Sequence, residues 1–188
     1  MANKLFVLLD FDRTLADTDQ LKYDFDQLLV CGLSLESALM EFGQTYQTLQ
    51  AGQKYLLPGA IELLSFLQQQ VIPHGILTYG QADWQRVKIL ATGLADLPVV
   101  ITDRTDKGAL IASWRQASGT YQLPPELGGR FVEQIMLIDD KIYSFDGLPA
   151  DALGLYCGGG QAESLPRNVQ SITNLSEAQD YIGQLLGY

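Results

Sequence analysis

Short, continuously apolar runs alternate along this chain with segments that have helical periodicity. A run that is apolar throughout, rather than at every second position, is typical of a strand buried on both faces of a parallel sheet. The alternation of such runs with helices predicts an α/β fold. The predicted strands are Leu5–Leu9, Gly75–Thr78, Val99–Thr102, Ile135–Ile138, Leu153–Cys157 and a weaker one near Val169–Thr173.

Helices are expected in the segments between these strands. The last one opens with Ser176-Glu177-Ala178-Gln179, the pattern of a capping box, in which two side chains satisfy free backbone N–H groups at the start of a helix. We therefore expect the final helix to begin at this tetrapeptide. The predicted helices are Ala60–Gln70, Asp83–Thr92, Gly108–Ser118 and about Glu177 to Leu186.

The segment between the first two strands is too long for a simple crossover. Residues 17–57 contain no proline and have helical periodicity, and Pro58-Gly59 then restarts the main fold. We expect a small helical cap (residues 17–57) inserted into a core of residues 1–16 and 58–188; two further core helices are the alternative. An earlier helix carries Leu21, Phe25, Leu28 and Leu29, and a later one has an apolar stripe of Leu35, Leu39, Phe42, Tyr46 and Leu49.

Composition narrows the class of protein. The 188 residues fit one domain with a modest insertion. The net charge of −10 and the pI of about 4.4 disfavour nucleic acid and anionic membrane surfaces as partners. Cys31 and Cys157 lack metal-ligand spacing, so we expect two reduced, mostly buried thiols in a cytoplasmic protein. No targeting or membrane segment is evident in the sequence.

Two aspartates follow the first predicted strand, one residue apart. Residues i and i+2 of an extended chain project to the same side, so Asp10 and Asp12 can reach one pocket. Open α/β sheets bind ligands at this carboxyl end of their strands. A nucleophile and a proton shuttle that are both carboxylates suit phosphoryl transfer through an acyl-phosphate.

Further polar residues follow other strands at the same edge. Thr78 ends the second strand, and Lys107 follows the third strand by a few residues, at the mouth of the next helix. Asp139-Asp140 ends the fourth strand. We expect this hydroxyl, this cation and these carboxylates to converge on the pocket of the first aspartate pair.

Four carboxylates around one pocket require a cation. Two carboxylates ~4 Å apart repel by about 4 kcal/mol at an effective dielectric constant near 20. Because neither histidine nor cysteine stands near the motifs, the oxygen donors favour a hard ion, and Mg²⁺ is the usual partner of phosphate. We expect the metal against Asp10, the carbonyl of Asp12, and Asp140, with Asp139 bound directly or through water.

These residues can be given roles in one reaction. Asp10 attacks phosphorus and forms an aspartyl-phosphate. Asp12 protonates the leaving oxygen and then deprotonates the attacking water. Thr78 and its neighbour Tyr79 are the candidate phosphate-binding residues of the second strand, while Lys107 and Mg²⁺ neutralise the transferring group.

The order Asp-x-Asp-x-Thr, Thr, Lys and Asp-Asp along the chain resembles the haloacid dehalogenase (HAD) superfamily of phosphatases and phosphomutases. The likeness extends from Leu5 to about Tyr156. The resemblance implies a Rossmann-like parallel sheet with helices on both faces, Mg²⁺, an aspartyl-phosphate intermediate and an inserted helical cap that screens substrates. Supporting stretches are Pro58-Gly59-Ala60-Ile61-Glu62-Leu63-Leu64, Thr78-Tyr79-Gly80 and Gln85-Arg86-Val87-Lys88.

Two positions leave a choice. Lys88 or Lys141 could serve as the phosphate-binding cation in place of Lys107, which we prefer because it follows the third strand. Many members of the superfamily have Gly where this chain has Arg13. A long cation at that position could contact substrate, but we expect it to point to solvent.

The leading prediction is a Mg²⁺-dependent hydrolase of small phosphomonoesters. A phosphomutase would differ in how well the closed cap excludes water. A phospho-acceptor signalling module without turnover uses similar residues, but its acidic pair comes first along the chain. A dehalogenase or a non-catalytic binding protein would not need Asp12 as acid and base. The cap has two lysines against six carboxylates, which favours a small phosphorylated metabolite with one phosphate.

Overall fold

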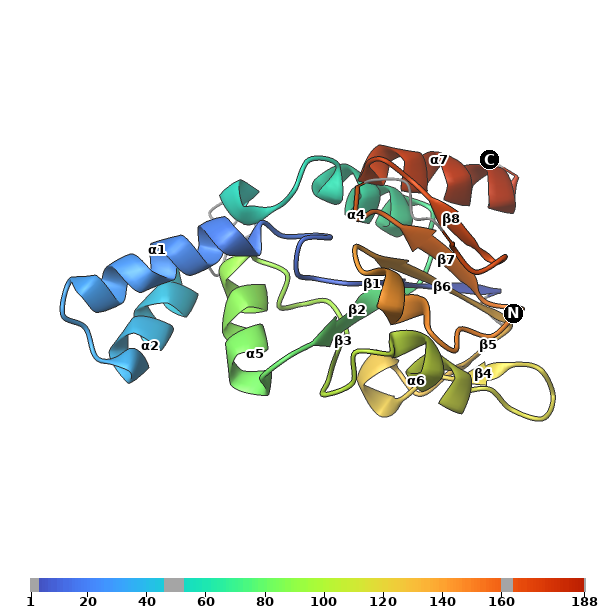
Figure 1. Cartoon of the computed structure of the whole chain (residues 1–188), viewed down its shortest axis with the longest axis horizontal. Coiled ribbons are helices and arrows are strands. Elements are labelled where there is room, and N and C mark those ends of the chain that lie inside the picture. The colour runs from blue at the N-terminus through green and yellow to red at the C-terminus, as the bar shows by residue number, and fades with distance from the viewer. Residues whose placement is uncertain (1–3, 46–52, 160–163, 188) are drawn as a thin grey trace.

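A six-stranded parallel sheet forms the centre of the computed structural model, which describes residues 4–45, 53–159 and 164–187 (Figure 1). Numbered along the chain, its strands lie in the order 3-2-1-4-5-6, which is the order of a Rossmann-like sheet. All of the predicted strands are present, with ends that differ from the prediction by no more than two residues. The strands are β1 (Leu5–Leu9), β2 (His74–Tyr79), β3 (Val99–Thr102), β6 (Gln134–Asp139), β7 (Leu153–Tyr156) and β8 (Val169–Ser171).

Strand β1 lies in the middle of the sheet, between β2 and β6, and is parallel to both. All five of its residues are buried. Its last residue, Leu9, is in register with Ile138 of β6, and the backbone N–H of Asp10 donates to the Ile138 carbonyl at 2.9 Å. The carboxyl ends of β1 and β6 therefore stop at the same level, where the strand order reverses and α/β folds bind ligands.

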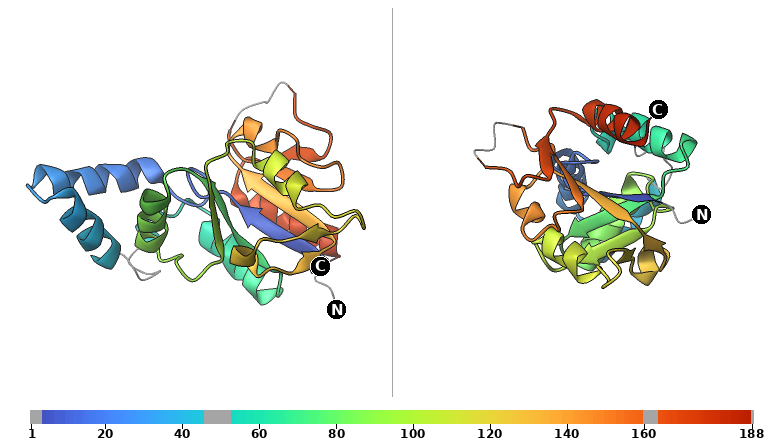
Figure 2. Two further views of the ribbon diagram at one scale, coloured as in Figure 1. Left: turned by 90° about the horizontal axis from the view of Figure 1, so that it is seen from below. Right: turned by 90° about the vertical axis from the view of Figure 1, so that its right-hand side faces the viewer.

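Helices cover both faces of the sheet (Figure 1, Figure 2). Alternate side chains of β1 enter two apolar clusters: Leu5, Val7 and Leu9 face one side, while Phe6 and Leu8 face the other. This two-sided burial explains why the strand is apolar throughout. The first face is covered by α4 (Ala60–Gln69), α5 (Ala82–Ala91) and α7 (Leu175–Leu186), and the second by α6 (Lys107–Ser113), η2 (Pro125–Leu127), η3 (Ile142–Phe145) and the hairpin of β4 (Tyr121–Gln122) and β5 (Phe131–Val132).

The predicted cap is a helical extension at one side of the core (Figure 2). It contains α1 (Thr18–Val30), α2 (Leu35–Thr45) and η1 (Gln53–Tyr55). The two connections to the core pair with each other, since Asp17 N–H donates to the Tyr55 carbonyl at 2.7 Å. The domain boundaries proposed from the sequence stay a prediction.

The cap packs on α5 of the core. Its apolar cluster combines Leu21 and Phe25 of α1 with Ala38 and Phe42 of α2, and Trp84 of α5 closes it from the core side. The Phe25 and Trp84 rings lie 4.7 Å apart between centroids. One helix of the core thus belongs to the packing of the cap as well.

Two members of the predicted cap stripe, Tyr46 and Leu49, lie outside the described residues. The first member of the stripe, Leu35, is 61% exposed at the start of α2, so the stripe is not buried along its whole length. The prediction that both thiols are mostly buried was wrong, since Cys31 is exposed after the end of α1 and Cys157 is half-buried. Cys31 stands at the C-cap of α1 and does not belong to the apolar cluster of the cap.

Two helix boundaries differ from the prediction by more than one residue. Helix α7 begins at Leu175, because the side chain of Asn174 accepts from the N–H groups of Ser176 and Glu177 at 2.9 and 3.1 Å. Helix α6 ends at Ser113 rather than Ser118, since the following residues turn into the β4–β5 hairpin. None of the helices within the described ranges is long and apolar enough to cross a membrane.

Candidate active site

The predicted polar residues meet at the carboxyl end of β1 and β6. A pocket there is lined by Asp10, Asp12, Tyr79, Thr105, Lys107, Asp139, Asp140, Lys141, Tyr143 and Ser144. Thr78 lies at the end of β2 and is fully buried. Its hydroxyl oxygen has no hydrogen-bond partner within the part of the chain that the structure describes. A larger cavity beside edge strand β3, of about 410 Å³, contains none of the predicted site residues.

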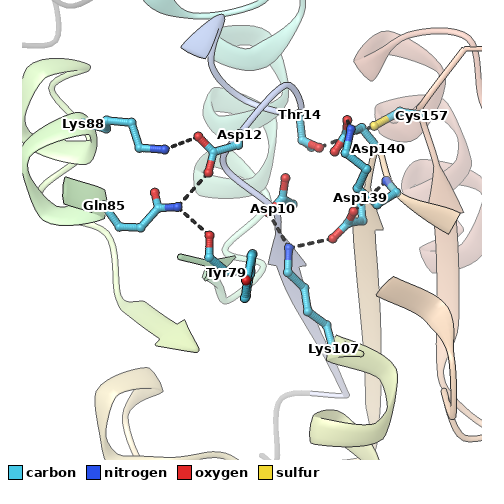
Figure 3. A network of polar contacts seen from close by, with 11 residues as sticks. Asp10, Asp12, Thr14, Tyr79, Gln85, Lys88, Lys107, Asp139, Asp140 and Cys157 are labelled. Carbon is cyan, nitrogen blue, oxygen red and sulfur yellow. Dashed lines mark hydrogen bonds and ion pairs between the residues drawn. The ribbon is translucent and has the colours of Figure 1, made fainter. Parts of the chain in front are cut away.

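Lys107 joins the two acidic strand ends. It is the first residue of α6, and its side chain is only 4% exposed. Its ammonium group forms an ion pair with Asp10 and lies 2.7 Å from Oδ2 of Asp139 (Figure 3). A Cβ on the next residue, Gly108, would stand 2.6 Å from the Asp146 carbonyl oxygen, so a glycine is needed where α6 starts this close to the segment after β6.

Burial and charge shift the pKa values of these groups. Burial raises the pKa of Asp10 from 3.8 to about 7, although the Lys107 ammonium opposes this change. Burial alone would lower the pKa of Lys107, but the carboxylates of Asp10 and Asp139 outweigh it and the pKa is raised. Burial also raises the pKa of Asp140, against the effect of the neighbouring Lys141. One lysine therefore does not fully compensate the buried acidic cluster.

The donor set of this cluster fits a hard divalent cation such as Mg²⁺. One carboxylate oxygen from each of Asp10, Asp139 and Asp140 lies within 4.8 Å of the other two. The Oδ1 atom of Asp140 is buried and has no hydrogen-bond partner among the described residues, so it is free to bind an ion. Oxygen donors are what Mg²⁺ requires. The structure thus brings together the three carboxylates that the sequence predicted for the metal site.

The remaining predicted metal-site residue is Asp12, whose side chain turns toward α5, away from Asp139 and Asp140 (Figure 3). Its carboxylate forms an ion pair with Lys88 and accepts from the Gln85 side chain at 2.7 Å. We predicted the Asp12 carbonyl as a metal ligand, which stays a prediction.

Gln85 and Lys88 belong to a stretch that supports the family resemblance, but the sequence pattern assigned Gln85 no role in the site and offered Lys88 only as an alternative to Lys107. Gln85 is 3% and Lys88 is 5% exposed. Residues three apart on a helix share a face, so two long polar side chains at this spacing on a core-packed helix are the signal that could have found them. Their partner, Asp12, could not be read from periodicity.

Two further predicted positions lie at the rim. Arg13 has a left-handed backbone conformation with φ +61°, which explains why glycine suits this position in other proteins. Its guanidinium is exposed and pairs with Asp19 of the cap at 2.9 Å, so the prediction that it points to solvent is confirmed. Tyr79 is 48% exposed, and its carbonyl accepts from the Gln85 side chain at 2.6 Å.

No protein-family model and no curated protein matches the sequence. Solved structures of the same fold do match it. A haloacid dehalogenase-like hydrolase from Burkholderia xenovorans LB400 is 17% identical with a TM-score of 0.62, over 98% of this chain and 99% of that one. A HAD-hydrolase from Bacillus subtilis bound to magnesium is 15% identical with a TM-score of 0.61, over 99% of this chain and 100% of that one.

A HAD phosphatase from Thermococcus onnurineus is 19% identical, with a TM-score of 0.59 over 97% of this chain and 98% of that one. These structures are similar to the chain along nearly its whole length. Their sequences are too different to transfer an activity, but the arrangement of elements is shared. The chain therefore has the haloacid dehalogenase-like fold.

Proposed function

We propose that this chain is a Mg²⁺-dependent hydrolase of small phosphomonoesters that acts through an aspartyl-phosphate on Asp10. One observation carries the proposal. A buried carboxylate at the end of the central strand, that of Asp10, pairs with the Lys107 ammonium and lies beside the acidic pair Asp139-Asp140. The likeness to a HAD phosphatase and to a magnesium-bound HAD-hydrolase supports the same reaction class.

The charges around the pocket suit a phosphomonoester. Four carboxylates face three lysine ammonium groups, which leaves a net charge of −1. A bound divalent cation would reverse this to +1, and a pocket with positive charge attracts a phosphomonoester dianion. Held by Asp10, Asp139 and Asp140, Mg²⁺ would neutralise charge on the phosphoryl oxygens. The carboxylates are Asp10, Asp12, Asp139 and Asp140, and the lysines are Lys88, Lys107 and Lys141.

Each of these side chains has a separate role in the first half-reaction. An oxygen of Asp10 attacks phosphorus while the bond from phosphorus to the alcohol oxygen breaks. Asp12, in its protonated form, gives its proton to that leaving oxygen. Lys107 binds the phosphoryl oxygens, and the unpartnered hydroxyl of Thr78 is available to donate to them. Tyr79, which lines the pocket, completes the proposed phosphate-binding residues.

The second half-reaction releases phosphate. Asp12 removes a proton from a water molecule, and the water oxygen attacks phosphorus. The bond between phosphorus and Asp10 breaks, which returns the nucleophile and liberates inorganic phosphate. Because Asp12 recovers from water the proton that it gave to the alcohol, the cycle is balanced.

The sheet topology argues against the signalling alternative. Phospho-acceptor modules of the flavodoxin-like type have the strand order 2-1-3-4-5, whereas this sheet has the order 3-2-1-4-5-6. A phosphomutase shares the residues named above, and it would differ in transferring the phosphoryl group to an alcohol rather than to water. No feature of the described residues favours it over the hydrolase.

The cap favours a substrate with one phosphate. Two of its carboxylates, Asp24 and Asp26, pair with its two lysines, so the remaining cap charges are negative. A second phosphate near the cap would be repelled. In a panel of phosphate esters we expect monophosphates of small metabolites to react fastest, and a preference for bisphosphates would contradict this.

Hydrolysis of p-nitrophenyl phosphate tests the proposed reaction. Wild type should turn over with Mg²⁺ and stop with a chelator, and Asp10→Asn and Asp12→Asn should each lose activity. Asp83→Asn is the matched control, because Asp83 is an exposed carboxylate on α5 whose ion-pair partner, within the part of the chain that the structure describes, is Arg86 alone. Retained activity in Asp10→Asn would remove the nucleophile. Stable phosphorylation of wild type without turnover would favour the signalling module.

A further inference from the structure

Helix α5 holds both oxygen atoms of the Asp12 carboxylate. The Nε2 atom of Gln85 donates to Oδ2 at 2.7 Å, and the Lys88 ammonium forms an ion pair with Oδ1 (Figure 3). The same Nε2 atom donates to the Tyr79 carbonyl at 2.6 Å. The Asp12 side chain therefore has two polar contacts with α5. One of its partners, Gln85, is in turn hydrogen-bonded to Tyr79 at the end of β2.

Gln85 and Lys88 are both buried, and neighbouring residues restrict the positions of their side chains. The Lys88 side chain is 6% exposed, and a buried ammonium is costly unless a carboxylate compensates it. Its Nζ atom also lies 5.7 Å from the Phe11 ring centroid and 5.9 Å from that of Trp84. These rings restrict where the ammonium can lie.

Gly80 makes room for the glutamine. Its φ is +147°, and a Cβ at this position would stand 2.5 Å from Gln85 Nε2. Any other residue would displace the amide that reaches Asp12. The contact therefore depends on three positions of the chain, Gly80, Gln85 and Lys88, none of which lies among the residues assigned to the metal or the phosphate.

We propose that Gln85 and Lys88 are positioning residues that set the orientation of Asp12 for proton transfer. This inference rests on the proposed hydrolase function, and it assigns these two side chains no contact with substrate. They act through Asp12, which needs one fixed orientation to give a proton to the leaving oxygen and to take one from water.

The arrangement also links Asp12 to the cap. Trp84, Val87 and Ala91 of α5 belong to the apolar cluster of the cap, while Gln85 and Lys88 on the same helix reach the site. Because α5 contacts the cap with one face and Asp12 with another, the position of this helix determines both contacts. The orientation of the proposed acid is thus tied to the way the cap rests on α5.

The rate of reaction with two aryl esters tests this inference. Phenyl phosphate has a poor leaving group that needs a proton, whereas p-nitrophenyl phosphate has a good one that needs little help. In Lys88→Met we expect kcat/KM, which reports the step that releases the phenol, to fall by about 10- to 100-fold for phenyl phosphate and by less than about threefold for p-nitrophenyl phosphate. Gln85→Leu should show the same pattern with a smaller loss.

Matched variants separate positioning from a general loss of structure. Lys88→Arg keeps the cation and should restore most of the phenyl phosphate activity. Arg86→Met changes an exposed cation on the same helix that pairs with Asp83 rather than Asp12, and it should leave both rates unchanged. In an Asp12→Asn background, Lys88→Met should cause no further selective loss. If Lys88→Met does not fold, Gln85→Leu and Lys88→Arg carry the test.

The outcomes distinguish the two proposals. A wild-type protein that hydrolyses neither ester contradicts the hydrolase function, and this inference falls with it. A wild-type protein that hydrolyses both, with variants at Gln85 and Lys88 that lose the two activities equally or not at all, overturns the positioning role alone.

Discussion

The Nζ atom of Lys107 lies 2.7 Å from Oδ2 of Asp139, which is fully buried at the end of β6. The same ammonium pairs with Asp10 at the end of β1. A single cation from the start of α6 therefore compensates two carboxylates on neighbouring central strands. The stability of this end of the sheet and the chemistry of the pocket depend on the same group.

Lys107→Met should destabilise the protein in the absence of metal. Removing one partner of a buried ion pair leaves an uncompensated charge, which costs about 3–5 kcal/mol. Chemical denaturation in the presence of a chelator measures the change in the free energy of unfolding. Arg86→Met is the control, since the Arg86 and Asp83 side chains are 70% and 76% exposed and a surface pair of this kind contributes less than about 1 kcal/mol. Equal effects of the two substitutions would contradict this account of Lys107.

The metal-free protein should show a pH dependence of stability that comes from Asp10. Its pKa is raised by burial to about 7 in the folded state, from an ordinary value of 3.8. Between these values the folded state binds more protons than the unfolded state, so this group lowers the free energy of unfolding as pH rises from about 4 to above 7. Asp10→Asn should remove this component. The test compares wild type and Asp10→Asn at pH 5 and pH 8 by denaturation with a chelator present, and identical pH dependence in both would contradict it.

Mg²⁺ should raise the melting temperature of wild type, and more at pH 8 than at pH 5. Protons compete with the metal for carboxylate oxygens, so binding weakens as Asp10 and Asp140 are protonated. Asp140→Asn should lower the affinity for Mg²⁺ at least about tenfold, because it removes the buried, unpartnered Oδ1 charge from the cluster. Titration calorimetry gives the affinity directly. An unchanged affinity in Asp140→Asn would exclude this residue as a ligand.

Gly80→Ala should lower the stability of the folded protein. It should also slow the hydrolysis of phenyl phosphate more than that of p-nitrophenyl phosphate. The backbone at this position has φ +147°, where a side chain costs about 1–3 kcal/mol, and the added Cβ would displace the Gln85 amide. We expect a lower melting temperature together with the selective loss on phenyl phosphate predicted for Gln85→Leu. A loss of stability with an unchanged ratio of the two ester rates would show that the Gln85 contact does not affect Asp12.

The sequence was sufficient to predict the strands of the sheet and the edge of the sheet at which the polar residues meet. Strand β1 and strand β3 were predicted to the residue, because buried strands are marked by continuous apolar runs. The positions of Asp10, Lys107 and Asp139 follow from this, since parallel strands bring their carboxyl ends together. The presence of helices between the first two strands also followed from the length and periodicity of that connection.

Other features depend on contacts that periodicity does not encode. The strands of the β4–β5 hairpin are two residues long, too short to show a period. Both Asn174 and Ser176 are good helix N-caps, and the fold selected Asn174. The pairing of Asp12 with Gln85 and Lys88 joins residues more than 70 positions apart, and only the packing of α5 against the first strand end determines it.

Detection of the covalent intermediate is the most direct test of whether the reaction proceeds through an aspartyl-phosphate on Asp10. In Asp12→Asn, hydrolysis of the phospho-enzyme should be slowed more than its formation from an ester with a good leaving group, so the intermediate should accumulate. This variant is mixed with radiolabelled p-nitrophenyl phosphate and Mg²⁺ and quenched in acid. We expect one phosphate per chain, labile to hydroxylamine and mapped by mass spectrometry to Asp10. Label on another residue, or label that persists when Asp10→Asn is added to the variant, would contradict this expectation.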